Sequence, residues 1–169
     1  MTINPSSIPT MHLKHARGNI LDMAEAGEFD IVVQGCNCYN MMGGGIAKEI
    51  ASRYPQAVEA DNATQAGKFD KVGTYTHSVI ERSKNDAWFL VNAYTQYTVS
   101  RGQDVFEYLG FELLLYKWAG WLPKQRWAFP YIGMGLAMGD PERIIPMLDN
   151  FARVIKEHGG SVTLVEFGG

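Results

Sequence analysis

Two glycine-rich segments are the residues of this sequence whose type and spacing best suit chemistry. They are Gly43 to Gly45 and Gly133-Met134-Gly135, and each follows an apolar stretch of chain. Glycines let an anion approach the backbone N–H groups closely, because no side chain blocks the way. A helix that begins just after such a turn adds the attraction of its dipole for negative charge. Either segment alone is also typical of an ordinary turn, but the pair favours an anion site that suits phosphate.

Neither segment matches a standard nucleotide motif. A P-loop requires Gly-Lys-Ser/Thr, whereas Lys48 follows Ala47 here. The dinucleotide pattern G-x-G-x-x-G also fails, since the third glycine after Gly133 and Gly135 is Gly139, one position too late. A hydride-transfer enzyme is therefore disfavoured.

Several reactive side chains have two interpretations. Lys48 is a candidate for a terminal phosphate or an ordinary surface lysine. Cys38 is a candidate nucleophile near a helix N-terminus or, as is commoner, a buried inert thiol. His77 lies inside an expected strand, which favours a core or hydrogen-bonded histidine. Tyr94 to Gln96 end another strand, at the edge where open α/β sheets bind ligands, and Gln96 is the first of these to test.

The cysteines and histidines do not indicate a metal site or a disulfide. Cys36 and Cys38 are separated by one residue, which makes a mutual disulfide geometrically poor. The four histidines show no ligand spacing that would complete a site around these thiols. We expect no metal and no cofactor.

Charge and hydropathy narrow the class of partner. The formal net charge is −3, and the 15 Lys and Arg residues are scattered instead of forming a basic stripe. A polymeric nucleic acid is therefore not expected, although a nucleotide-sized anion is compatible. No apolar run approaches the roughly 20 residues of a membrane span, and the start MTINPSS lacks signal-peptide features. We expect a cytoplasmic protein without a membrane partner.

The elements that must position these residues alternate between strand and helix, which predicts α/β layering in a single domain over 1–169. The spacing of apolar residues, and the glycines, prolines and polar turns that interrupt it, predict strands at 11–17, 30–36, 73–80, 87–97, 126–131 and 161–167. Helices are expected at 20–26, 46–54, 55–65, 105–122 and 141–159.

Three details of this pattern are specific enough to check. The continuous apolar run at 30–36 predicts a strand in the middle of the sheet. Asp140 before Pro141 predicts a capped start for the last helix, and Asp104 is expected to cap the helix at 105–122. One stripe of that helix is expected to contain Phe106, Leu109, Leu113 and Tyr116 or Lys117.

Three motifs, in the right order, resemble those of the macro domains over nearly the whole chain. Gly18-Asn19-Ile20 matches the Gly-Asp-Ile/Leu turn after the family's first strand. Residues 34–37, followed by 43–46, match an Asn-Ala-Ala-Asn type motif and its Gly-Gly-Gly-Ile/Val loop, and residues 132–136 match the second phosphate loop. One branch of the family is especially similar, the one that includes ADP-ribose-1''-phosphate phosphatases of fungi and similar bacterial and phage proteins. The segments whose amino-acid sequences resemble that branch are 35–38, 44–47, 54–55 and 91–97.

The resemblance implies a three-layer α/β/α sandwich around a mixed, mostly parallel sheet of about six strands. It also implies that Asn37 holds the distal ribose, that both glycine loops hold the diphosphate, and that Asn19 stands where an acidic residue usually meets the adenine amino group. The ligand-binding residues implied in this way are Asn19, Ile20, Asn37, Gly43, Gly44, Gly45, Ile46, Ala47, Gly133, Met134, Gly135, Leu136 and Ala137.

The resemblance is weaker for catalysis. Ala47 and Ala137 occupy the two positions at which branches of the family carry a catalytic aspartate. Asn37 and Asp140 are the remaining catalytic candidates, although a plain helix cap is the favoured interpretation of Asp140. The resemblance implies a hydrolase that acts on the distal ribose, by removing a 1''-phosphate or by cleaving an ADP-ribosyl bond.

The alternative is a non-catalytic reader of ADP-ribose or a related NAD-derived nucleotide. Replacement of both aspartates favours the reader, and the lack of a fused partner domain counts against it. The expected partners are ADP-ribose or a derivative and, as a second candidate, an ADP-ribosylated protein.

Overall fold

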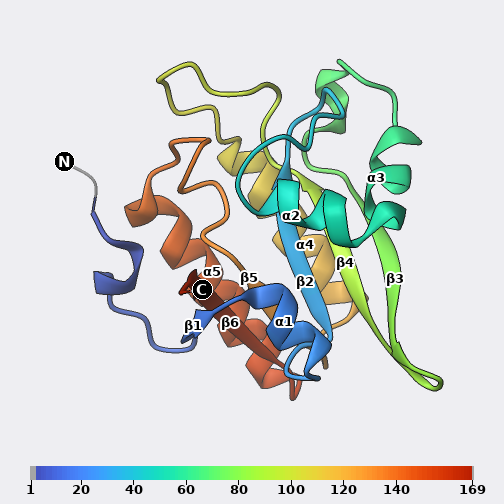
Figure 1. Cartoon of the computed structure of the whole chain (residues 1–169). Coiled ribbons are helices and arrows are strands. Elements are labelled where there is room, and N and C mark those ends of the chain that lie inside the picture. Colours follow the sequence, from blue (N-terminus) through green and yellow to red (C-terminus); the bar gives the residue numbers. More distant parts are fainter. Residues whose placement is uncertain (1–2, 169) are drawn as a thin grey trace.

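The sheet is built around strand β2 (Ile31–Cys36) in the computed structural model, which describes residues 3–168. Figure 1 shows the whole chain and the course of its strands. The sheet has six strands in the order β1-β6-β5-β2-β4-β3, with β1 (Lys14–Gly18), β6 (Ser161–Phe167), β5 (Arg126–Phe129), β4 (Asp86–Tyr94) and β3 (Tyr75–Ser83). All neighbours are parallel except β3 and β4, which form an antiparallel hairpin. The predictions of a mixed, mostly parallel sheet and of a central buried strand at 30–36 are confirmed.

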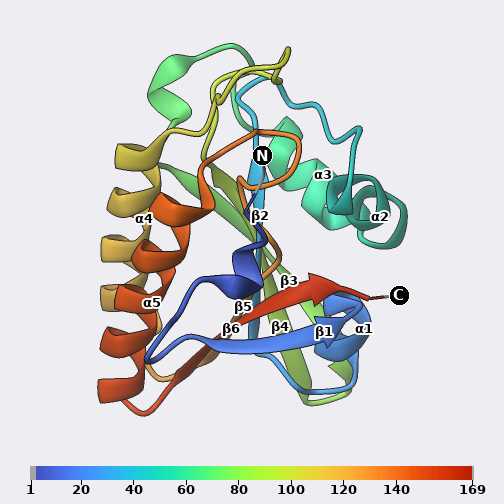
Figure 2. The same cartoon turned by 90° about the vertical axis from the view of Figure 1, so that its left-hand side faces the viewer.

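Helices cover both faces of this sheet, as Figure 2 shows with α4 and α5 on one side and α2 and α3 on the other. The first group comprises α4 (Tyr108–Trp121) and α5 (Pro141–Glu157). The second comprises α1 (Ile20–Glu25), α2 (Ile46–Arg53) and α3 (Pro55–Asn62), and short 3₁₀ helices lie at Pro5–Ser7 and Phe69–Lys71. The α/β layering predicted from the alternating pattern and the three-layer arrangement implied by the resemblance are confirmed.

Side chains that alternate along β2 divide the core into two halves. Ile31 and Val33 pack with the buried faces of α4 and α5, whereas Val32 packs with those of α1, α2 and α3. Successive side chains of a strand point to opposite faces of the sheet, so a continuous apolar run is required when both faces are covered. This explains why the segment contains no polar alternation until Gln34, whose amide donates to Asn92 Oδ1 at 2.8 Å.

The predicted start of α5 is confirmed, and the predicted start of α4 is wrong. Asp140 Oδ1 accepts from the backbone N–H of Glu142 at 2.9 Å, and Pro141 opens the helix. Asp104 instead accepts hydrogen bonds from the backbone N–H of Phe106 and from the Tyr108 hydroxyl. It lies four residues before Tyr108, the first residue of α4. Its short Asx turn competes with helix formation, so α4 begins at Tyr108.

The buried stripe of α4 also differs from the prediction. Leu109, Leu113 and Tyr116 are exposed, and Phe106 lies before the helix. The buried residues are Phe111, Leu114, Leu115 and Trp118. Both stripes have helical spacing and apolar side chains, so periodicity did not distinguish the face that packs against the sheet.

Several boundaries shift by a few residues. The first strand begins at Lys14, the strand expected to reach residue 97 ends at Tyr94, the one expected to reach 131 ends before Pro130, and α3 ends at Asn62. Within 3–168, no helix combines the length and apolar character needed to cross a bilayer. Residues 1, 2 and 169 of the expected single domain lie outside the described part of the chain.

The Asp149 carboxylate joins the start of β1 to helix α5. It accepts hydrogen bonds from the backbone N–H groups of Met11, His12 and Leu13 at distances between 2.8 and 3.3 Å. Burial raises the pKa of this carboxyl, but the backbone hydrogen bonds outweigh that effect and the net pKa lies below its ordinary value. The ionised form therefore stabilises the fold.

We predict that Asp149→Asn lowers the free energy of unfolding by about 1–2 kcal/mol at neutral pH, since the backbone N–H groups then donate to a neutral amide oxygen instead of a charged carboxylate. A depressed pKa stabilises the native state above the unfolded value of about 3.9, and this contribution is lost as the pH falls through the folded value. The difference between the two proteins should therefore shrink below about pH 4. Urea denaturation across this pH range measures it.

Asp70→Asn is the matched control, because the exposed Asp70 side chain has no hydrogen-bond partner among residues 3–168. It should leave stability nearly unchanged. An equal loss in both variants, or a loss for Asp149→Asn that does not depend on pH, would contradict this role of the carboxylate.

Candidate functional site

The two glycine segments meet beyond the carboxyl ends of β2 and β5. A Cβ placed on Gly44 would lie 2.7 Å from Cδ1 of Leu136, so the two loops are in direct contact. The parallel strands β1, β6, β5 and β2 all end on this side of the sheet, which is where open α/β sheets bind ligands. The structure thus brings together the two segments that the sequence placed about 90 residues apart.

The first loop leads directly into helix α2. Gly45 occupies the N-cap with a φ of 56°, a left-handed conformation that favours glycine. No side chain among residues 3–168 caps this helix, so its first-turn N–H groups are available to a ligand. Lys48 is exposed, in agreement with its interpretation as a surface lysine, and Ala47 is half-buried. The arrangement suits an anion at the helix N-terminus.

The second loop is held in shape by its own backbone. Gly139 N–H donates to Gly133 O at 2.6 Å, and Met138 N–H donates to Gly135 O at 3.0 Å. Gly133 has a φ of 71°, and a Cβ there would lie 2.3 Å from the Phe106 ring, so only glycine fits. By contrast, a Cβ on Gly135 would meet nothing within 4 Å, which leaves open space at that position. The loop is therefore preorganised with an open face at Gly135.

A cavity of about 430 Å³ adjoins the first loop. Three segments and β6 contribute to its wall, and the lining residues are Gly18, Asn19, Ile20, Gly45, Ile46, Glu49, Pro130, Tyr131, Val165 and Phe167. This volume lies in the range of small-molecule sites. Four of the predicted ligand-binding residues line it: Asn19, Ile20, Gly45 and Ile46.

Asn19 lies in the cavity wall, but its amide is already engaged. Its Oδ1 caps helix α1 by accepting from the backbone N–H groups of Leu21 and Asp22 at 3.0 and 3.1 Å. Its Nδ2 donates to Glu49 Oε1 at 3.0 Å. Asn19 therefore has little capacity to accept from a ligand, and the carboxylate at this end of the site comes from Glu49.

Sequence reasoning missed Glu49. The signal that could have identified it is its position three residues into the helix after Ile46, which places a first-turn acidic side chain beside the glycine loop. That pattern is common at helix starts for purely structural reasons, so it did not single out this residue.

At the other end of the site, Asn37 is 8% exposed and holds its own loop. Its Nδ2 donates to Met41 O at 2.9 Å, and its Oδ1 accepts from the Tyr39 backbone N–H at 2.9 Å. Cys38 is fully buried, and burial raises the pKa of its thiol. These features favour the inert interpretation of Cys38, because the thiol is the less nucleophilic form.

Gln96 lies where β4 leads toward the second glycine loop. It forms an isolated β-bridge with Phe106, the residue that packs against Gly133, and its Nε2 donates to Thr98 O at 2.8 Å. The side chain is half-buried. Gln96 thus lies two residues beyond the end of β4, and its backbone is paired with the residue that packs against Gly133.

The remaining candidates have structural roles or lie apart. Asp140 caps α5, and its N–H donates to the Tyr108 hydroxyl at 2.8 Å. Ala137 is buried, Met134 packs against the core, and Leu136 is exposed. The expectation of a core or hydrogen-bonded His77 is wrong, because that residue is exposed on β3 and packs its ring 5.1 Å from the Trp121 ring. Edge strands leave one flank open, which explains the exposure.

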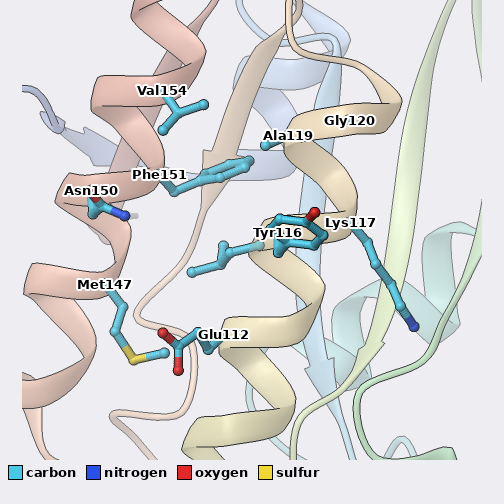
Figure 3. Close-up of a pocket in the computed structure, with 10 residues that line it drawn as sticks. Glu112, Tyr116, Lys117, Ala119, Gly120, Met147, Asn150, Phe151 and Val154 are labelled. Atoms are coloured by element: carbon cyan, nitrogen blue, oxygen red, sulfur yellow. The ribbon is translucent and has the colours of Figure 1, made fainter.

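A larger groove of about 610 Å³ lies between α4 and α5 (Figure 3). Its wall contains side chains such as Glu112, Tyr116, Met147 and Phe151, which come from the two helices. It contains neither glycine loop and lies away from the carboxyl ends of the parallel strands. The smaller cavity is therefore the better candidate site. Within 3–168, no group of three or more His, Cys, Asp and Glu side chains is arranged to bind a metal.

Comparison with known proteins gives relatives at low identity. No protein-family model matches the chain. An uncharacterised 17.5 kDa protein of Enterobacteria phage T4 is 28% identical over 145 residues, which cover 84% of this chain and 91% of that protein. The phage protein is uncharacterised, so this similarity gives no information about function.

Solved structures share the fold. The macrodomain of Thermus aquaticus DarG has a TM-score of 0.59 at 18% identity, over 93% of this chain and 98% of that one. Thermosipho africanus DarTG, solved with ADP-ribose, has a TM-score of 0.62 at 15% identity, over 82% of this chain and 38% of that one. The strand order, the helix layers and these similarities agree, and the chain has the macro domain fold.

Proposed function

We propose that this protein binds ADP-ribose or a close derivative in the site formed by the two glycine loops and the adjoining cavity. The observation that carries the proposal is the contact of Gly44 with Leu136, which joins both loops beside a cavity of about 430 Å³. The DarTG structure contains ADP-ribose, which supports the same class of ligand here.

The chemistry of the walls orients the ligand. The cavity is mainly apolar, with Ile20, Ile46 and Tyr131 in its wall, and suits the flat adenine and its ribose. The diphosphate then meets the uncapped N-terminus of α2 and the open face of the second loop at Gly135. This orientation directs the distal ribose toward the Asn37 loop and Gln96.

We propose further that the protein hydrolyses a derivative at this distal ribose, either a 1''-phosphate ester or an ADP-ribosyl bond. With alanines at 47 and 137, catalysis depends on positioned water and on backbone donors aimed at the developing charge. Asn37 and Gln96 are the candidates to orient the reacting group. The capping bond of Asp140 makes it the weaker catalytic candidate.

A non-catalytic reader of ADP-ribose is the second candidate function. The engagement of both Asn37 and Asp140 in hydrogen bonds within the protein favours it. A turnover experiment separates the two functions. The protein is incubated with ADP-ribose-1''-phosphate and, separately, with ADP-ribosylated protein, and release of phosphate and ADP-ribose is followed. Release from either substrate supports hydrolysis, whereas tight ADP-ribose binding without release from either identifies a reader.

Gly44→Glu is expected to weaken ADP-ribose binding by about 100-fold or more, because it places a like charge and bulk at the diphosphate. The fold should survive, since the nearest atom is Cδ1 of the exposed Leu136 side chain, which can move aside. Calorimetric titration measures the affinity, and circular dichroism checks the fold.

Gly120→Glu is the matched control for that variant. It introduces the same charge on α4, at a position where a Cβ meets nothing within 4 Å. We expect its affinity for ADP-ribose to equal that of the unaltered protein. If Gly44→Glu also retained full affinity, the first loop would have no role in holding the diphosphate.

Gln96→Ala is expected to reduce kcat by about 10- to 100-fold on the hydrolysed substrate, since it removes a group that positions the reaction. The affinity for ADP-ribose should change by less than about threefold, because the diphosphate contacts remain. Single-turnover rates and calorimetry measure the two effects separately. Thr98→Ala is the control, since Gln96 Nε2 donates to the backbone oxygen of Thr98, which this substitution keeps. An unchanged kcat in Gln96→Ala would remove this residue from the mechanism.

A further inference from the structure

Glu49 is the only charged side chain among the described residues that line the cavity. The other lining groups are glycines, the Asn19 amide, and apolar or aromatic side chains. The Glu49 side chain is 36% exposed, so it is neither buried in the core nor free in bulk solvent. A carboxylate in this position is an acceptor of hydrogen bonds and repels the oxygen atoms of a ligand.

A network of hydrogen bonds holds this carboxylate in place. Oε1 accepts from Asn19 Nδ2 at 3.0 Å and from Arg53 Nη1 at 3.0 Å, and the same Arg53 nitrogen donates to Asp22 Oδ1 at 2.8 Å. These bonds connect α1 to α2 across one side of the cavity. Glu49 is therefore fixed with respect to both helices.

The orientation of the Asn19 amide follows from the helix cap. Two backbone N–H groups of α1 donate to its Oδ1, so the nitrogen must face Glu49. Both hydrogen bonds to Glu49 within residues 3–168 end on Oε1. Oε2 is left as an acceptor without a protein partner in this part of the chain.

We propose that Glu49 selects a purine with a 6-amino group by accepting a hydrogen bond from it at Oε2. This inference rests on the proposed function, which places the base of the ligand in this cavity. Adenine offers an N–H donor at position 6, whereas hypoxanthine offers a carbonyl oxygen that the carboxylate repels. Position 19 is an asparagine, and Glu49 of helix α2 supplies the carboxylate in this cavity instead.

The test compares two ligands that differ in that one group, ADP-ribose and inosine diphosphate ribose. Calorimetry on the unaltered protein should give about 10- to 100-fold tighter binding of ADP-ribose, the value of one charge-assisted hydrogen bond. In Glu49→Gln, Asn19 and Arg53 still donate to the amide oxygen, which leaves the amide nitrogen where Oε2 was. That nitrogen donates to a 6-oxo group, so the preference should fall by at least about tenfold or reverse.

Glu59→Gln makes the same charge change on the exposed face of α3 and should leave the preference unaltered. If the unaltered protein binds neither ligand, the proposed function fails, and this inference falls with it. If ADP-ribose binds but the two ligands bind equally well, the inference about Glu49 is overturned while the proposed function stands. The same holds if Glu49→Gln keeps the original preference. The comparison on the unaltered protein needs no variant, so equal binding of the two ligands would overturn the inference even if Glu49→Gln fails to fold.

Discussion

The close approach of two loops at the edge of the sheet is the constraint on which the site depends. A side chain at position 133 would collide with the Phe106 ring, and one at position 44 would push the exposed end of the Leu136 side chain aside. Glycine at 133 is required by this packing, glycine at 44 leaves the first loop open beside Leu136, and the parallel strands β2 and β5 bring their ends to the same edge. The candidate anion site is therefore made mainly of backbone, and the preference for negative charge that we propose for it rests on N–H groups and the α2 dipole.

The cavity beside these loops has the opposite character. Its walls are mainly apolar apart from Asn19 and Glu49, which are hydrogen-bonded to each other, and Arg53 outside the wall donates to Glu49. In the binding mode that we propose, backbone donors attract the anionic part of a ligand, and the fixed carboxylate of Glu49 selects among bases. A carboxylate repels phosphate, so the proposed binding mode keeps the diphosphate away from Glu49.

Much of this architecture could be predicted from the sequence, because the signals were local. The continuous apolar run at 31–36 and the cap at Asp140 predicted their elements correctly. Features that depend on tertiary packing, such as which face of a helix is buried, could not be predicted from the sequence as well. Helix α4 has two apolar stripes, and only packing against the sheet decides that Leu114 is buried while Leu113 is exposed. His77 was misjudged for the same reason, since its exposure depends on β3 being an edge strand.

In the candidate site, too, local motifs could be predicted from the sequence, and side-chain contacts could not. The two glycine loops and Ile20 were visible as motifs, and the structure places them together. Asn37 and Asp140 were named for possible chemistry, but their side chains make hydrogen bonds within the protein that the sequence does not reveal. Glu49 was missed because its role depends on the spatial neighbourhood of two helices, not on a spacing along the chain.

The most direct test of the central claim is an NMR titration of the labelled protein with ADP-ribose, which follows each backbone amide. If the two loops hold the diphosphate, the largest saturable shifts will come from the amides of 43–47 and 133–137, together and with one dissociation constant. Shifts confined to the groove between α4 and α5, or no saturable shifts in either loop, would contradict it.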